Sequence, residues 1–138
     1  MVVFITGKAG AGKTAVANKL KKRLEERGKR VLLLDEDEVR EQRGDIGFSR
    51  TARYNHIEIM SDFAAIAENQ GFTVIISAIM PKEHIRMNGR SRVRKSCLVH
   101  VMGGTMWEVT TYYPPSKDEK EGLYHEIQPY DRKISAIP

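Results

Sequence analysis

The feature that most constrains this chain is a glycine-rich segment near its start, residues 7–14, with the sequence GKAGAGKT. It matches the pattern G-x-x-x-x-G-K-[S/T] at every fixed position, and it lies between a short apolar run (residues 2–6) and a segment with helical patterning (residues 15–27). A phosphate-binding loop requires this strand–loop–helix setting. Glycines let the backbone approach a ligand closely, so that successive N–H groups surround phosphate oxygens at a helix N-terminus. The segment therefore predicts a nucleoside triphosphate site.

Two side chains of this loop carry the expected chemistry. The ammonium group of Lys13 can reach the β- and γ-phosphates, and the hydroxyl of Thr14 can bind Mg²⁺. We therefore expect ATP and Mg²⁺ as cofactors and Lys13 as a catalytic residue, although the loop alone does not reveal what happens to the γ-phosphate. The residues expected to contact the nucleotide are Gly7, Lys8, Ala9, Gly10, Ala11, Gly12, Lys13, Thr14 and Ala15.

Length and composition favour a single globular domain over residues 1–138, since 138 residues suit one hydrophobic core. No apolar stretch approaches the roughly 18 residues of a membrane span, and the first residues lead into the loop without a secretory signal. The single cysteine, Cys97, excludes an internal disulfide and is typical of a cytoplasmic protein. A net charge of +5 suits a polyanionic ligand, either a nucleotide or nucleic acid.

Apolar runs alternate with helical patterns along most of the chain. Such alternation predicts a three-layer α/β/α fold with a mainly parallel sheet of about four strands, whose ligands lie at the carboxyl ends of the strands. Residues 114–138 show neither pattern and are expected to form a weakly structured tail or a replacement lid. A four-strand sheet would expose an edge, which this tail or a homodimer partner would cover. The expected strands are 2–6, 31–35, 72–79 and 97–102, and the expected helices are 13–27, 51–69, 82–94 and 105–112, with a short helix or turn at 38–43.

A second group of polar residues follows the second expected strand, where Asp35 and Asp37 flank Glu36. Carboxylates beside a triphosphate are candidates for binding Mg²⁺ or for orienting an attacking hydroxyl. A plainer interpretation is an acidic helix start, because carboxylates favour a helix N-terminus. With the phosphate-binding loop nearby, we expect Asp35 to join Thr14 at the metal and Asp37 to act on the acceptor.

The order and spacing of these motifs resemble the adenylylsulfate kinases. That family typically carries Asp-Gly-Asp-x-x-Arg after the second strand, Asp-Leu-Gly-Phe-Ser, Asp-Arg, Asn-Ile-Arg-Arg, Ile-Ser-Pro after the third strand, and Lys-Gly-Leu-Tyr. The resemblance covers residues 1–81 well and the remainder loosely. The matching residues here are Asp35-Glu36-Asp37 with Arg40, Asp45-Ile46-Gly47-Phe48-Ser49, Arg53, Ile57, Ile79-Met80-Pro81 and Gly122-Leu123-Tyr124.

The resemblance implies a P-loop fold of the nucleotide-kinase branch and transfer of the ATP γ-phosphate to the ribose 3′-hydroxyl of adenylylsulfate. By the same resemblance, Asp37 orients or deprotonates the acceptor hydroxyl, Arg40 and Arg53 hold its anionic groups, and Phe48 stacks on its adenine. Plainer roles also suit these residues: surface ion pairs for the arginines, a core or loop anchor for Phe48, and a buried hydrogen bond for His56. The expected acceptor-binding residues are Asp37, Arg40, Phe48, Arg53, His56, Ile79 and Pro81.

The departures from the family pattern concentrate on the acceptor side. Residue 36 is glutamate instead of glycine, and residue 80 is methionine instead of serine. His56 replaces asparagine, and Glu58 reverses the sign of an arginine. A sulfate-bearing acceptor would be poorly served by that reversal, so one hypothesis is a kinase with a rewritten acceptor site. The remaining departures are Ala52 for aspartate, Ile59 for arginine and Glu121 for lysine.

Three hypotheses for function follow. The first is a kinase that phosphorylates a small nucleotide-like acceptor, adenylylsulfate or a related nucleotide-linked metabolite. The second is an ATP-binding module without transfer activity. The third is a polynucleotide or modified-base kinase, which a basic patch would suit, although a solvated surface explains such a patch equally well. That patch comprises Lys82, Arg86, Arg90, Arg92, Arg94 and Lys95.

Overall fold

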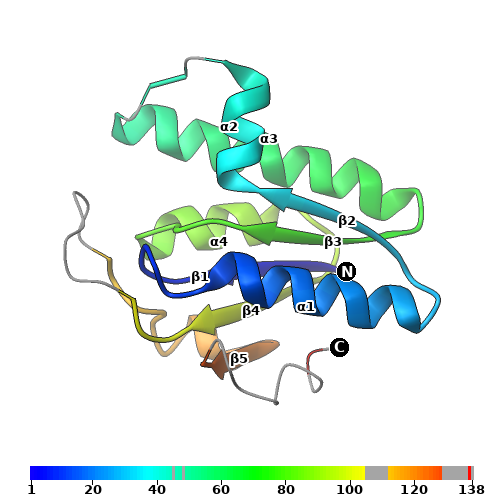
Figure 1. Ribbon diagram of the computed structural model, residues 1–138. Coiled ribbons are helices and arrows are strands. Elements are labelled where there is room, and N and C mark those ends of the chain that lie inside the picture. The colour runs from blue at the N-terminus through cyan, green and yellow to red at the C-terminus, as the bar shows by residue number, and fades with distance from the viewer. Residues whose placement is uncertain (45, 48, 105–111, 129–136, 138) are drawn as a thin grey trace.

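The computed structural model describes residues 1–44, 46–47, 49–104, 112–128 and 137. Strands and helices alternate along most of this chain, and the strands form one parallel sheet between layers of helix (Figure 1). No helix in the described part of the chain is both long and apolar enough to cross a membrane. The elements are β1 (Val2–Thr6), α1 (Lys13–Glu26), β2 (Arg30–Asp35), α2 (Glu36–Arg43), α3 (Arg50–Asn69), β3 (Phe72–Ser77), α4 (Glu83–Ser91), β4 (Ser96–Val101), the 3-10 helix η1 (Glu119–Glu121) and β5 (Tyr124–Ile127).

The sheet has the strand order β2-β3-β1-β4-β5, with β1 at its centre. Its central register pairs Val2 with Val74 on one side and with Ser96 on the other. All of β1 is buried, as expected for a strand covered on both faces. The three-layer α/β/α prediction is therefore confirmed, and the phosphate-binding loop follows the central strand.

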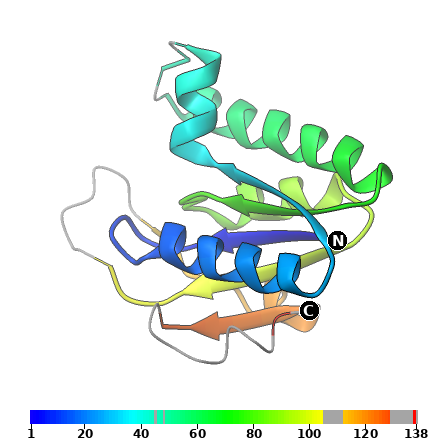
Figure 2. The same ribbon diagram turned by 45° about the vertical axis from the view of Figure 1, so that its right-hand side comes forward.

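Helices cover both faces of the sheet. The helix α1 packs on one face through an apolar stripe that includes Val16, Leu20 and Leu24. The helices α3 and α4 cover the other face, where Met60 and Ile85 meet side chains of the sheet (Figure 2). The short helix α2 begins at the carboxyl end of β2 and extends beyond the sheet beside α3 (Figure 1).

The prediction of about four strands was too low, because the described part of the chain contains a fifth. The strand β5 lies in the segment for which the sequence predicted no strand, and it pairs in parallel with β4. The tail therefore covers the edge of β4 that a four-strand sheet would have exposed. Most boundaries lie within about two residues of the predicted ones. The exceptions are α4, which ends at Ser91 instead of residue 94, and the predicted helix 105–112, which lies outside the described residues except for Tyr112.

Two helix ends are fixed by residues that favour such positions. Ser49 caps α3, because its hydroxyl accepts a hydrogen bond from the backbone N–H of Ala52 at 3.1 Å. Gly28, just beyond α1, has a φ of 82°, which glycine adopts without steric cost. These residues fix where α1 ends and where α3 begins.

Candidate functional site

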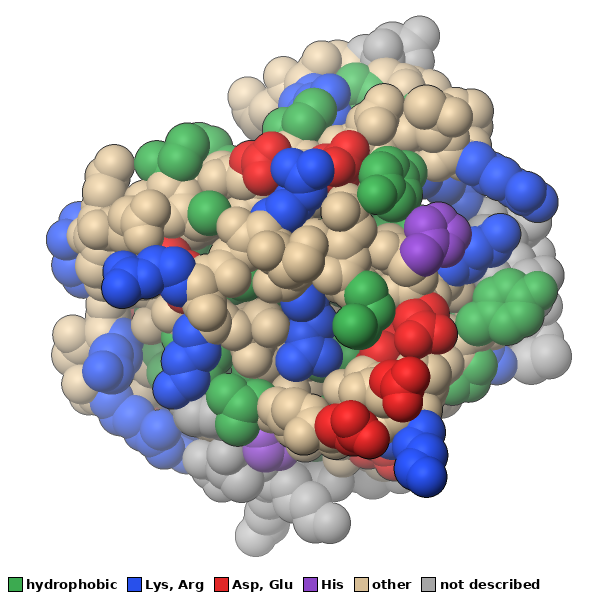
Figure 3. All heavy atoms as spheres, turned by 180° about the vertical axis from the view of Figure 1, so that it is seen from behind, with side chains coloured by type: hydrophobic (Ala, Val, Ile, Leu, Met, Phe, Trp, Pro, Cys, Tyr) green, Lys and Arg blue, Asp and Glu red, His purple; other side chains and the backbone are tan. Residues whose placement is uncertain are grey.

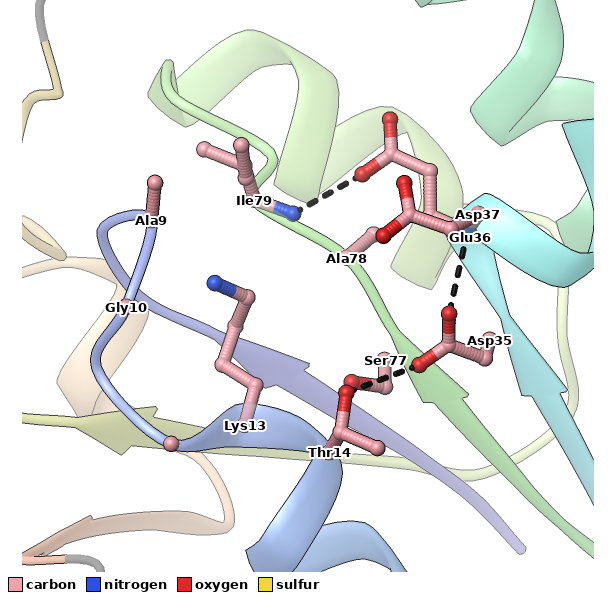
Figure 4. Close-up of a pocket in the computed structure, with 11 residues that line it drawn as sticks. Ala9, Gly10, Lys13, Thr14, Asp35, Glu36, Asp37, Ser77, Ala78 and Ile79 are labelled. Carbon is pink, nitrogen blue, oxygen red and sulfur yellow. Dashed lines mark hydrogen bonds between the residues drawn. The ribbon is translucent and has the colours of Figure 1, made fainter. Parts of the chain in front are cut away.

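A cavity of about 380 Å³ lies at the carboxyl ends of β1, β2 and β3. This is the edge of a parallel sheet at which ligands bind. The phosphate-binding loop forms one side of the cavity, and the start of α2 and the residues after β3 face it (Figure 4). The residues that line the cavity are Ala9, Gly10, Gly12, Lys13, Thr14, Asp35, Glu36, Asp37, Ser77, Ala78 and Ile79.

The loop has the backbone geometry that the glycines were expected to permit. Gly10 and Gly12 have φ values of 73° and 97°, in a region that other residues seldom adopt. A Cβ atom on Gly7 would lie 2.6 Å from the carbonyl oxygen of Val101, so only glycine fits there. The loop is thereby fixed against the end of β4.

The amino group of Lys13 folds back over the loop and donates a hydrogen bond to the carbonyl oxygen of Lys8 at 2.8 Å. Of the nine residues predicted to contact nucleotide, five line the cavity. Ala11 is 2% exposed and belongs to the apolar core, so any contact with nucleotide would come from its backbone. The remaining predicted contacts, Gly7, Lys8 and Ala15, lie outside the cavity lining.

Asp35 connects the phosphate-binding loop to α2. One carboxylate oxygen accepts a hydrogen bond from the hydroxyl of Thr14 at 3.1 Å, and the other caps α2 by accepting one from the backbone N–H of Asp37, also at 3.1 Å. The same residue is therefore both a helix cap and the partner of the predicted metal ligand. The two interpretations of Asp35 left open by the sequence are compatible.

This pair also suits Mg²⁺ chemically. The ion prefers oxygen ligands, and in nucleotide sites it takes one or two from the protein and the rest from phosphates and water. Asp35 and Thr14 supply a carboxylate and a hydroxyl oxygen on the cavity wall. Within the described residues no group of three or more His, Cys, Asp or Glu could hold a metal ion by itself, so a metal here would depend on the nucleotide.

Glu36 lies across the cavity from the phosphate-binding loop (Figure 4). Its Oε2 atom accepts a hydrogen bond from the backbone N–H of Ile79 at 3.1 Å, and its Oε1 atom lies 3.7 Å from Nε of Arg40. The carboxylate therefore holds the residue after β3 to the start of α2. Asp37 follows on the same helix, is exposed, and directs its carboxylate into the cavity opposite Lys13 (Figure 4).

The other predicted acceptor residues lie at different depths. Arg40 donates to the carbonyl oxygen of Gly47 at 2.8 Å and so supports the loop between α2 and α3. Arg53 is half-buried on the first turns of α3, and Pro81 is buried. Neither lines the cavity. The structure does not test the prediction for Phe48, which lies outside the described residues.

His56 does not line the cavity, because its side chain is fully buried. Arg43 donates a hydrogen bond to Nδ1 at 2.8 Å, and Nε2 lies 3.3 Å from the carbonyl oxygen of Glu36. An arginine can only donate, so Nδ1 accepts and Nε2 carries the proton. Burial lowers the pKa of His56, which keeps the ring neutral. The residue ties α3 to the start of α2, as the plainer interpretation expected.

Sequence reasoning missed three lining residues: Glu36, Ser77 and Ala78. The expected strand ran to residue 79, whereas β3 ends at Ser77, and both Ser77 at its end and Ala78 just beyond it lie on the cavity wall. For Glu36 the signal was present, because it stands between two predicted site residues. It was treated as a departure from a family pattern instead of as a ligand-facing group.

The predicted basic patch is not one surface. Arg86 is fully buried, Arg90 is half-buried, and Arg92 pairs with Glu58 and Asp62. The basic side chains on the face opposite that of Figure 1 are interspersed with acidic and apolar ones (Figure 3). Because Glu58 forms this ion pair and does not line the cavity, its charge does not oppose an acceptor there.

A parallel sheet of this order, with a phosphate-binding loop after its central strand and carboxylates across the cavity, defines a P-loop protein of the kinase type. A model of the adenylylsulphate kinase family matches residues 1–131. The chain therefore belongs to the adenylylsulphate kinase family.

Two curated relatives support this membership. An adenylyl-sulfate kinase of Burkholderia ambifaria is 36% identical over 124 residues, which are 89% of this chain and 66% of that protein. A probable adenylyl-sulfate kinase of Pyrococcus abyssi is 35% identical, with 88% of this chain and 67% of that protein covered. The chain thus spans about two thirds of the length of these relatives.

Among solved structures, an APS kinase of Mycobacterium tuberculosis carrying a Cys-to-Ala substitution superposes with a TM-score of 0.75. The identity is 25%, and the match covers 98% of this chain and 89% of that one. A second structure of that enzyme, in complex with AMPPNP and APS, gives a TM-score of 0.79 at 20% identity. The fold of this chain is thus the fold of these kinases.

Proposed function

We propose that the protein is an ATP-dependent kinase that transfers the γ-phosphate to a hydroxyl of a nucleotide-like acceptor, adenylylsulfate or a related nucleotide-linked metabolite. One observation supports this most: Lys13 of the phosphate-binding loop and Asp37 of α2 face each other across a single cavity. A cation for the transferring phosphoryl group and a carboxylate for the attacking hydroxyl are the groups that such a transfer uses.

In this proposal each residue has a distinct task. The backbone N–H groups of residues 9–13 surround the β- and γ-phosphates, and Lys13 stabilises the negative charge of the transferring group. Asp37 orients the acceptor hydroxyl and accepts its proton while the oxygen bonds to phosphorus and the bond to ADP breaks. Thr14 and Asp35 would hold Mg²⁺, which neutralises phosphate charge when bound.

The other predictions have less support. Among the described residues no feature favours the polynucleotide kinase, because several of its proposed basic residues are buried or paired. If the protein phosphorylates no acceptor, the hypothesis of an ATP-binding module without phosphoryl transfer activity remains. A homodimer, a cytoplasmic location and a single domain over residues 1–138 stay predictions from the sequence.

Two substitutions test the proposal. Lys13→Ala should abolish transfer. Asp37→Asn should lower kcat by about 100-fold or more, the range of general base catalysis, while the Kd for MgATP changes little. Glu38→Gln is the matched control, since Glu38 is the next residue, is exposed, and does not line the cavity. An unchanged kcat in Asp37→Asn, or an equal loss in Glu38→Gln, would show that Asp37 lacks this task.

A further inference from the structure

The short segment after β3, residues 79–81, forms part of the acceptor side of the cavity and is held in an unusual backbone conformation. Met80 has a φ of 45°, the one positive φ among the described non-glycine residues. Such conformations persist where surrounding contacts enforce them, and they concentrate at functional sites. The Met80 side chain is 1% exposed and packs in the apolar core. In this 79–81 turn Ile79 therefore lines the cavity, whereas the side chain of Met80 lies in the core.

Hydrogen bonds from two sides hold Ile79 in this turn. Its N–H donates to Glu36 at 3.1 Å, and its carbonyl oxygen accepts from the hydroxyl of Thr6 at 2.5 Å. Thr6 ends the central strand and precedes the phosphate-binding loop. The position of Ile79 is thus fixed relative to both halves of the cavity.

The carbonyl groups of Met80 and Pro81 also accept hydrogen bonds, from residues that do not line the cavity. Nη1 of Arg86, on α4, donates to the carbonyl oxygen of Met80 at 2.8 Å, and the backbone N–H of Tyr113 donates to that of Pro81, also at 2.8 Å. Tyr113 belongs to the segment that follows β4, far along the chain from the turn. The segment that follows β4 therefore takes part in holding the acceptor side.

The orientation of Arg86 is set by a residue of the tail, Glu119. Nε and Nη2 of Arg86 donate to the two carboxylate oxygens of Glu119 at 2.7 and 2.9 Å, and both side chains are fully buried. The backbone N–H of Ser116 also donates to this carboxylate at 3.0 Å. Because a guanidinium group is planar, this two-point contact fixes the direction of Nη1 toward Met80.

A buried ion pair of this kind contributes little net stability to the fold. Removing the charges from water costs about as much as their attraction returns, and apolar replacements of similar volume are often as stable. What apolar side chains cannot supply is the hydrogen bond to the carbonyl oxygen of Met80. The arrangement is therefore explained better by the position it gives the 79–81 turn.

We propose that Glu119, acting through Arg86, is a positioning residue that sets the affinity of the site for its acceptor. The tail holds the acceptor side of the cavity, while the phosphate-binding loop binds the nucleotide independently. This inference rests on the proposed kinase function, and it predicts that disturbing the pair affects the acceptor far more than MgATP.

The test uses the double substitution Arg86→Met with Glu119→Leu, which removes both charges and both sets of hydrogen bonds. Thermal unfolding should show that the double variant still folds, because no unpaired charge remains, with a melting temperature lowered because the carbonyl oxygen of Met80 and the N–H of Ser116 lose these partners. Even so, the KM for adenylylsulfate should rise about tenfold or more through the displaced turn, with the KM for MgATP changed less than about twofold. Lys120→Gln is the matched control, since Lys120 adjoins Glu119 but pairs with Glu126 at the surface.

A wild-type KM for adenylylsulfate in a stably folded double variant would overturn the proposal, and so would equal increases in both KM values. If the double variant does not fold, Arg86→Lys decides in the same way, because a lysine cannot reproduce the two-point contact with Glu119 that directs the third hydrogen bond to Met80. Exchange of the Ile79 amide hydrogen, followed by NMR, should also accelerate in the variants. That readout needs no substrate, so it still tests the pair if the wild type phosphorylates nothing and the kinase proposal itself fails.

Discussion

Asp35 offers a direct way to separate the folding role of a site residue from its proposed metal role. Its carboxylate caps α2 and accepts a hydrogen bond from Thr14. Replacing an aspartate cap with alanine costs about 1 kcal/mol. The exposed bond to Thr14 contributes about 0.5 kcal/mol, at the low end for hydrogen bonds. Asp35→Ala should therefore lower the free energy of unfolding by about 1.5 kcal/mol, or the melting temperature by about 5 °C for a chain of this size.

Asp35→Asn should behave differently in the same assay. Asparagine caps helices as well as aspartate does, and its amide group can donate to the hydroxyl oxygen of Thr14. The melting temperature should therefore stay within about 2 °C of the wild-type value. The negative charge is lost, however, so the Mg²⁺ concentration needed for half-maximal transfer should rise about tenfold, equivalent to about 1.4 kcal/mol.

Two measurements on purified variants check this reasoning: thermal unfolding without nucleotide, and transfer rates over a Mg²⁺ titration at fixed ATP. Asp35→Ala should be impaired in both, and Asp35→Asn in the second only. If Asp35→Asn needs no more Mg²⁺ than the wild type, Asp35 does not contact the metal. If Asp35→Ala unfolds at the wild-type temperature, the capping argument is wrong.

Three further predictions follow from single positions. Gly7→Ala should abolish binding of an ATP analogue in calorimetry, because its Cβ atom would lie 2.6 Å from the carbonyl oxygen of Val101; wild-type affinity would contradict it. Burial raises the pKa of Cys97 to about 11, so iodoacetamide at pH 8 should label it only after unfolding, as mass spectrometry would show. Burial lowers the pKa of His56 from 6.5, so the unfolded state binds the extra proton first and stability should fall as the pH drops below about 6.5. His56→Gln should flatten this slope in thermal unfolding between pH 7 and 5, and an unchanged slope would exclude His56 as its source.

The fold, and the cavity between the phosphate-binding loop and the residues after β2, could be predicted from the sequence because their signals are local. The phosphate-binding loop is eight consecutive residues between a strand and a helix, and Asp35 and Asp37 follow the next strand directly. In a parallel sheet the carboxyl ends of neighbouring strands meet at one edge, so the two groups had to lie close together.

The parts that could not be predicted depend on contacts between distant segments. The strand β5 has only four residues, two of them polar, and it is a strand because it pairs with β4. Arg86 was assigned to a basic patch, and Glu119 lies among other charged residues of the sequence, yet folding buries the two against each other. Charged residues are usually exposed, and only the tertiary structure shows where a partner of opposite charge allows two of them to be buried.

The predictions for the proposed acceptor side also depended on contacts between distant segments. Glu58 was expected to reverse a charge at the acceptor, but α3 directs it toward Arg92. The acidic groups across the cavity from the phosphate-binding loop are Glu36 and Asp37, and Glu36 also accepts a hydrogen bond from the N–H of Ile79. The choice of acceptor is therefore expected to depend on the start of α2 and the 79–81 turn.

The most direct test of the central claim is transfer of the γ-phosphate from labelled ATP to adenylylsulfate, with Lys13→Ala as the blank. The panel also includes other nucleotides, nucleotide-linked metabolites, and single- and double-stranded DNA and RNA. We predict transfer to adenylylsulfate or another nucleotide-like acceptor that depends on Lys13 and Mg²⁺. Bound ATP with no transfer to any acceptor on the panel would contradict the kinase proposal and favour a nucleotide-binding module, and transfer to DNA or RNA alone would contradict the choice of a small acceptor.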